Sequence, residues 1–174
     1  RHDLEFKYKQ LRHGPVLSQR QVEARLAFCR DNLNQDWALV MFSDESRVST
    51  SPDSPVMWWV KRGQHIYVEA EKFPPSIMVW AGIIGPMKTP LIKCPQRLNA
   101  EGYAEMLETN GIFAFLRWCG DNSLFQQDGA PCHTAVSTMR RLHDNGIRVL
   151  ARWPANSPDL SPVEQVWAIM KRYI

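Results

Sequence analysis

The order in which strand-like and helix-like hydrophobic patterns follow one another restricts the fold of this chain more than any other feature. Short apolar runs typical of buried strands cover residues 38–42, 77–84, 89–93, 123–127 and 147–150. Helical patterns precede the first run, separate the last three and follow the final one. This order predicts an α/β fold with a mixed five-stranded sheet and helices on both of its faces.

Capping and breaking residues predict where the helices begin and end. Ser18 and Gln21 form a capping-box pattern, and Asn99 is placed to cap a second helix that residues 110–111 break. Residues 161–162 predict the start of the last helix, with serine as N-cap and proline in the first helical position. The inward faces predicted for these three helices are Val22, Leu26, Cys29 and Leu33; Tyr103, Met106 and Leu107; and Val163, Val166, Trp167 and Met170.

Composition limits the class of protein. With 174 residues, 44% hydrophobic and 22% charged, the chain suits one globular domain with a packed core. Its longest apolar run is too short to cross a bilayer and no signal peptide opens it, so a soluble protein is expected. The four cysteines lack metal-site or disulfide spacing and are expected to be buried free thiols. The formal charge of +3 leans basic, and residues 1–17 are predicted to form a basic arm or linker.

Three acidic residues stand out by their positions. Asp44 and Asp128 each follow an apolar run, where the chain is expected to leave the sheet, and Glu164 falls in the first turn of the last helix. If the two strands are parallel neighbours, both aspartates emerge at one end of the sheet, and a helix packed there brings Glu164 close. Three such carboxylates repel one another unless they bind cations or protons, and their hard oxygens suit Mg²⁺ or Mn²⁺.

Each of these acids also has an ordinary structural interpretation. Glu164 follows Ser161 by three residues and can complete a capping box, while Asp44 and Asp128 can be turn residues that follow strands. Glu45 is not expected to join the cluster, because successive residues of an extended segment point to opposite faces. Asp159 falls in the proline-rich turn before the last helix.

Four segments resemble the Tc1-like branch of the Tc1/mariner transposases. Residues 42–47 (FSDESR) resemble the motif of the family's first aspartate, and residues 125–135 (FQQDGAPCHTA) resemble the second. Residues 153–167 (WPANSPDLSPVEQVW) are similar to the motif of the third acid, and residues 76–82 (SIMVWAG) to a further strand of the family. Three ordered motifs are far more specific than any single acidic pair.

The resemblance implies an RNase H-like DDE catalytic domain over residues 18–174. It implies that Asp44, Asp128 and Glu164 are the catalytic residues and the ligands of two Mg²⁺ or Mn²⁺ ions, with Asp44 bridging both. The implied reaction is DNA strand cleavage at transposon ends, followed by attack of the freed 3′-hydroxyl on target DNA, usually at TA. The implied partners are DNA and, for the full-length protein on DNA, a second copy of the chain; the implied location is the nucleus.

The resemblance further implies that residues 45–75, an insertion after the first strand, form a clamp that contacts a partner subunit or DNA. Trp58 and Trp59 are large apolar groups within it, and Lys61 and Arg62 are expected to face DNA phosphates. Arg47 is a further candidate for DNA contact. His133 is expected to touch DNA or to hold the active-site loop, with a purely structural hydrogen bond as the alternative.

The sequence departs from the family pattern in two ways. The separation of Asp128 and Glu164 is one residue longer than the commonest Tc1-like spacing. No segment matches the family's N-terminal helix-turn-helix modules, so we expect a fragment that begins in the linker and stops soon after the catalytic helix. Two other functions stay open: a domesticated transposase that binds DNA without cutting it, and an RNase H-like nuclease that acts on RNA–DNA hybrids.

Overall fold

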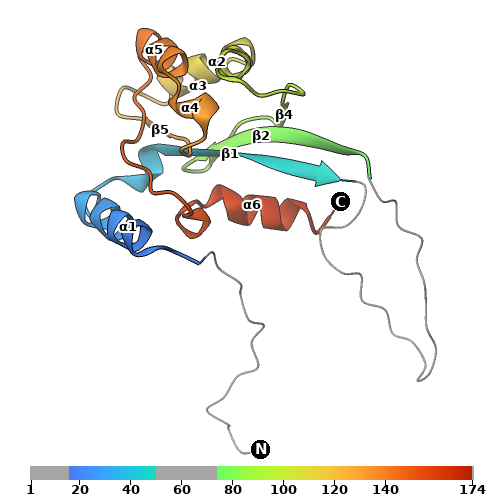
Figure 1. Cartoon of the computed structure of the whole chain (residues 1–174). Coiled ribbons are helices and arrows are strands. Elements are labelled where there is room, and N and C mark those ends of the chain that lie inside the picture. The colour runs from blue at the N-terminus through green and yellow to red at the C-terminus, as the bar shows by residue number, and fades with distance from the viewer. Residues whose placement is uncertain (1–15, 50–73, 174) are drawn as a thin grey trace, which may run out of the picture.

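The computed structural model describes residues 16–49 and 74–173, which form an open sheet with helices on both faces (Figure 1). The strands are β1 (Val40–Ser49), β2 (Ser76–Ile84), β3 (Met87–Lys88), β4 (Ile92–Lys93) and β5 (Leu124–Gln126). The helices are α1 (Gln19–Asp31), α2 (Ala100–Thr109), α3 (Ile112–Trp118), α4 (Pro131–Thr134), α5 (Val136–Asp144) and α6 (Val163–Met170), with single 3₁₀ turns η1 (Trp37–Leu39) and η2 (Pro158–Leu160).

The sheet is mixed, as the order of elements predicts. Its strand order is β3-β2-β1-β5, with β4 also paired to β2. β1 runs antiparallel to β2 and parallel to β5, the neighbour that carries the second acidic motif. Two predicted strands are shorter in the structure than the sequence pattern indicates. Residues 147–150 make only one β-bridge, between Val149 and Phe125, and the run 89–93 contributes only β4. Pro90 has no N–H to give to a ladder, which explains the shorter strand.

β1 is longer than the sequence indicates. The predicted strand ended at residue 42 and the insertion began at residue 45, whereas β1 continues to Ser49. The reason is β2, which pairs with β1 as far as Ser49 and Ser76. Asp44 therefore lies inside a strand, and the prediction that it follows a strand end is wrong. Because β5 pairs with β1 only up to Phe42, Asp44 nevertheless lies beyond the carboxyl end of its parallel neighbour.

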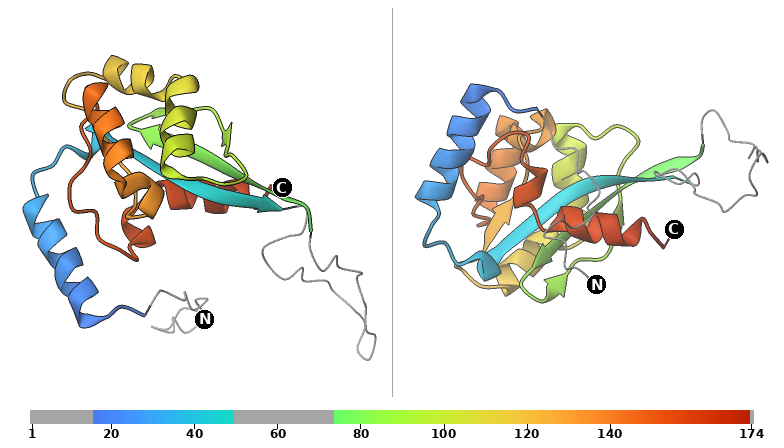
Figure 2. Two further views of the ribbon diagram at one scale, coloured as in Figure 1. Left: turned by 45° about the horizontal axis from the view of Figure 1, so that its top comes forward. Right: turned by 90° about the horizontal axis from the view of Figure 1, so that it is seen from below.

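Alternation along β1 divides the core into two layers. Met41 packs in a cluster with residues of α2, α3 and α5, whereas Val40 and Phe42 pack in a second cluster with residues of α1 and α6. Figure 2 shows the same division, with α1 and α6 on the face opposite α2, α3 and α5. Because side chains alternate between faces, this register assigns neighbouring residues of β1 to different helices.

The predicted helix signals are mostly confirmed. Ser18 and Gln21 form the capping box of α1, the Asn99 side chain accepts a hydrogen bond from Gly102 N–H at 2.8 Å, and Gly111 separates α2 from α3 with a φ of 74°. The inward face of α2 is confirmed, since its three predicted residues are at most 5% exposed. The short helix α4 is not predicted by the sequence pattern.

Two predicted helix faces are only partly correct. In α1 the buried residue is Phe28, whereas Val22, Leu26 and Leu33 are exposed. In α6, Val163 and Trp167 are buried but Val166 is 40% exposed. The four cysteines are free as expected, although Cys94 alone among them is buried and Cys29 is exposed. Within the described ranges, no helix combines the length and apolar character needed to span a bilayer.

Candidate active site

A pocket of about 320 Å³ opens at the carboxyl end of β5 and contains the three predicted carboxylates in its wall. Asp44 comes from β1, Asp128 from the loop after β5, and Glu164 from the first turn of α6. The loop of residues 153–158 forms a large part of the remaining wall. Asn156 in this loop has a φ of 53°, a left-handed conformation that asparagine tolerates better than most residues. Three distant parts of the sequence thus meet at one cavity.

Asp44 is partly buried between β1 and α6. It points from β1 toward α6, where its Oδ2 accepts a hydrogen bond from the indole Nε1 of Trp167 at 3.2 Å. Burial and, after it, the negative charge of Glu164 together raise the pKa of Asp44 to about 6. The indole hydrogen bond opposes this rise but does not cancel it. Asp44 and Glu164 are therefore close enough to repel each other.

Asp128 is held by contacts within its own loop. Its Oδ1 accepts the backbone N–H of Ala130 at 2.9 Å and lies 2.6 Å from Nδ1 of His133. The hydrogen bond with His133 lowers the pKa of Asp128, and the Ala130 N–H acts in the same direction. Its side chain remains 55% exposed. Asp128 is thus a turn residue that follows a strand, as one interpretation predicts, and it also lines the pocket.

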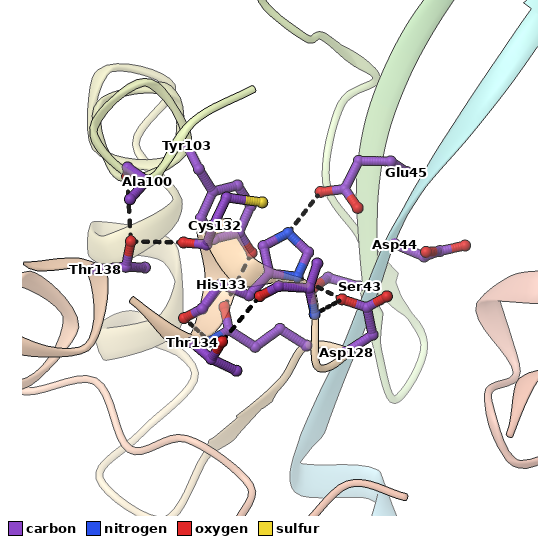
Figure 3. A network of polar contacts seen from close by, with 12 residues as sticks. Ser43, Asp44, Glu45, Ala100, Tyr103, Asp128, Cys132, His133, Thr134 and Thr138 are labelled. Atoms are coloured by element: carbon purple, nitrogen blue, oxygen red, sulfur yellow. Dashed lines mark hydrogen bonds and ion pairs between the residues drawn. The ribbon is translucent and has the colours of Figure 1, made fainter. Parts of the chain in front are cut away.

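His133 lies behind Asp128, inside the protein. Its side chain is 3% exposed, and its ring centroid is 4.2 Å from that of Tyr103 (Figure 3). Its second nitrogen, Nε2, lies 3.3 Å from Oε1 of Glu45. Burial lowers the pKa of His133, but the contacts with Asp128 and Glu45 outweigh burial and raise the pKa to about 10. Such burial favours a role inside the protein, in which His133 holds the active-site loop or makes a structural hydrogen bond; contact with DNA stays a prediction.

Glu164 reaches the pocket from the start of α6. The predicted serine cap is wrong: the helix begins at Val163 without a side-chain cap, and the Ser161 hydroxyl is buried with no hydrogen-bond partner in the described part of the chain. A 3₁₀ turn of residues Pro158–Leu160 precedes the helix and sets this geometry. The capping-box interpretation of Glu164 is therefore wrong. Burial, and after it the negative charge of Glu164, raises the pKa of Asp44.

The pocket offers oxygen ligands for a cation. Three carboxylates line it, and repulsion between two of them raises the pKa of Asp44. Within residues 16–49 and 74–173, no three acidic, histidine or cysteine side chains are arranged closely enough to hold one ion as they stand. The chemistry of the donors suits Mg²⁺ or Mn²⁺, because both prefer carboxylate and water oxygens.

The predicted DNA contacts have different outcomes. Arg47 is exposed on β1 and stays a prediction. Lys61 and Arg62 lie outside the described residues, together with the two tryptophans and nearly all of the proposed clamp. Two residues of the site were missed as functional candidates: Trp167 was assigned only to an apolar stripe, and Glu45 was only excluded from the cluster. A clue for Trp167 is its position one helical turn after Glu164, on the same side of α6.

A family model described as DDE superfamily endonuclease matches residues 39–174. The chain belongs to the DDE superfamily endonuclease family. It is 29% identical over 170 residues to the Transposable element Tc3 transposase of Caenorhabditis elegans, a match that covers 95% of this chain and 51% of that relative.

Solved structures of the mariner transposase Mos1 share the fold of this chain. A pre-cleavage Mos1 transpososome has a TM-score of 0.79 at 20% identity, and the mariner Mos1 paired end complex with Mg has 0.74 at 22%. Each match covers 98% of this chain and 54% of the other. The RNase H-like fold and the resemblance to Tc1/mariner transposases are thus confirmed. The chain spans about half the length of the Tc3 and Mos1 proteins.

Proposed function

We propose that this chain is the catalytic core of a cut-and-paste DNA transposase, which cleaves DNA at transposon ends and joins the freed 3′-hydroxyl to target DNA. One observation carries the proposal: in a member of the DDE endonuclease family, Asp44, Asp128 and Glu164 line a single pocket. These three residues are the proposed catalytic groups. Strand transfer into target DNA at TA, a homodimer on DNA and a nuclear location are further parts of the proposal, which family resemblance alone supports.

The proposed cofactors are two divalent ions, Mg²⁺ or Mn²⁺. The three carboxylates would hold them, and the bound ions would supply Lewis acidity at the reacting phosphate and acidify the attacking hydroxyl or water. The mariner Mos1 paired end complex with Mg supports this choice of metal for a protein of the same fold. The repulsion that Asp44 experiences from Glu164 also favours a cation between these groups.

The residues around the pocket have separate tasks in this proposal. Trp167 fixes one oxygen of Asp44, while the Ala130 N–H and His133 fix one oxygen of Asp128. Fixed carboxylates reduce the reorganisation that the site undergoes when it binds a charged ligand.

The experiment is cleavage of supercoiled plasmid and of linear duplex DNA by the purified chain in Mg²⁺ and in Mn²⁺. Asp128→Asn keeps the shape of the side chain but removes the charge that holds a hard cation, so cleavage should fall by about 10³-fold or more. Asp121→Asn, at an exposed position in the turn before β5, is the matched control and should cleave like the original chain.

Circular dichroism and duplex binding separate catalysis from folding. Both should be nearly the same in Asp128→Asn and in the unaltered chain. Near-native cleavage by Asp128→Asn in Mg²⁺ would remove the carboxylate from the mechanism. A chain that binds duplex DNA but cuts neither substrate with either metal would instead be the domesticated DNA-binding protein, and preferential cutting of RNA–DNA hybrids would indicate the third function.

A further inference from the structure

Glu45 is a shielded carboxylate for which the proposed chemistry has no use. It neighbours Asp44 in β1 but points to the opposite face of the sheet, toward α2 and α4 (Figure 3). Its side chain is 15% exposed, and Oε1 lies 3.3 Å from Nε2 of His133. The contact is an ion pair, and neither atom has a hydrogen-bond partner in the described part of the chain. Each therefore depends on the other for compensation of its burial.

The imidazole ring of His133 is held at both of its nitrogens and against an aromatic ring. Its Nδ1 lies 2.6 Å from Asp128, and its ring packs against Tyr103 with 4.2 Å between centroids. The backbone carbonyl of His133 accepts a hydrogen bond from Nε2 of Gln127 at 3.0 Å. Gln127 is itself fixed, because its Oε1 accepts the Tyr103 hydroxyl at 3.1 Å. A ring held in this way has little freedom to move relative to the carboxylates.

We infer that Glu45 is a positioning residue for Asp128 and acts through His133, an inference that rests on the proposed function of the pocket. Glu45 fixes the far edge of the imidazole, so the near edge keeps Nδ1 directed at Oδ1 of Asp128. Asp128 then presents its carboxylate to the pocket in one orientation. Glu45 is not itself a proposed metal ligand, because it points to the face opposite Asp44 and does not line the pocket.

The contact chain links one face of the sheet to the pocket beyond the end of β5. It begins at Glu45 on the face covered by α2, passes through His133 of α4 and ends at Asp128 in the pocket. Partners that orient a metal ligand from behind typically change metal affinity by 10–100-fold when they are removed. This magnitude separates a positioning role from a packing role, which would change stability without a specific effect on the metal.

Glu45→Gln tests the inference because it keeps the size of the side chain and removes its charge. Mn²⁺ binding to the chain, measured by titration calorimetry without DNA, should weaken by about 10–100-fold. Urea unfolding should show that the variant remains folded. Glu105→Gln, on the exposed surface of α2, is the matched control and should leave Mn²⁺ affinity unchanged.

A double-mutant cycle with His133→Gln decides whether Glu45 acts through His133. If it does, Glu45→Gln has no further effect on Mn²⁺ affinity once His133 is replaced. Equal weakening in both backgrounds would show that Glu45 acts directly, and unchanged affinity in a folded Glu45→Gln chain would reduce it to packing. If Glu45→Gln does not fold, Glu45→Asp keeps the charge and shortens the reach, and it should weaken Mn²⁺ binding in the same sense.

A metal-independent measurement distinguishes this inference from the proposed function. The ¹⁵N chemical shifts of the His133 ring report its contact with Asp128 in the chain without metal. Glu45→Gln should shift the Nδ1 signal as well as the Nε2 signal, because both edges of the ring move together. If the unaltered chain binds no Mn²⁺, the proposed metal site fails, and the Nδ1 signal alone decides the role of Glu45: an unshifted signal overturns it.

Discussion

The indole Nε1 of Trp167 donates a hydrogen bond to Oδ2 of Asp44 across 3.2 Å, joining the last helix to the first strand. Trp167 is 3% exposed and belongs to the cluster that packs α6 against the sheet. The same side chain therefore anchors the helix that carries Glu164 and orients the acid that faces it. Helix packing and the geometry of the pocket are coupled through one residue.

Trp167→Phe should reduce metal-dependent cleavage more than it reduces the stability of the fold. The ring stays apolar, but Asp44 loses its donor, so the pKa of Asp44 should rise above about 6. Loss of a hydrogen bond to a charged group costs about 1.5–3 kcal/mol, equivalent to roughly 10–100-fold in metal-dependent cleavage. The measurement combines cleavage rates with NMR titration of the Asp44 carboxyl carbon. Trp118→Phe, at a 72% exposed position in α3, is the control; equal rates for both variants would contradict the coupling.

Asp44 should make the metal-free chain less stable as the pH rises from 4 to 7. Its pKa in the folded chain is about 6, above the ordinary value of 3.8, so its contribution to stability is fully present below pH 3.8 and is lost as the pH passes 6. Relative to the unaltered chain, Asp44→Asn should therefore gain about 1–2 kcal/mol between these limits after solvent screening. Urea unfolding at several pH values checks this, with Asp121→Asn as the control. Parallel pH curves for Asp44→Asn and the unaltered chain would contradict the raised pKa.

The pairing of His133 with Asp128 should make the stability of the fold depend on pH over a different range. The pKa of His133 is raised from 6.5 to about 10, so its contribution is fully present below pH 6.5 and is lost as the pH rises through 10. The pKa of Asp128 is lowered, so its contribution is present above pH 3.8 and is lost only in stronger acid. His133→Asn should thus lose less stability than the unaltered chain between pH 6.5 and 10. Unfolding curves at pH 6 and 9 measure the difference, and His143→Asn, at an exposed position, should show none.

Local patterns in the sequence predict most elements of this fold because their causes are local. The capping box at Ser18, the cap at Asn99 and the break at Gly111 each depend on a few neighbouring residues. The length of β1 does not, since it depends on β2, whose pairing continues to Ser49. The face of α1 is likewise decided by tertiary contacts: Phe28 is buried against Trp153, a residue far away in the sequence.

The site shows the same division between local and long-range causes. Alternation in an extended chain correctly separates Asp44 from Glu45, because it is a property of the strand itself. The serine cap of α6 fails because the turn Pro158–Leu160 leads the chain into the helix differently. The contacts of Trp167 with Asp44 and of Glu45 with His133 join residues more than 80 positions apart. No local pattern encodes such contacts, so sequence reasoning could name the acids but not the groups that hold them.

The final prediction concerns Lys61 and Arg62, which lie outside the described residues. They belong to the insertion that we propose as a clamp on DNA, and Arg47, exposed near the end of β1, is a third candidate. A protein releases about one counterion for each phosphate it neutralises, so replacing Lys61 and Arg62 together with alanine should reduce the salt slope of duplex binding by about two. Affinity should fall most at low salt, where such contacts are strongest.

Arg20→Ala with Arg30→Ala removes the same charge from α1 and is the matched control. Fluorescence anisotropy across a salt series measures both slopes. If the Lys61 and Arg62 variant and the control change the slope equally, only net charge matters; if neither changes it, the insertion does not bind DNA through these residues.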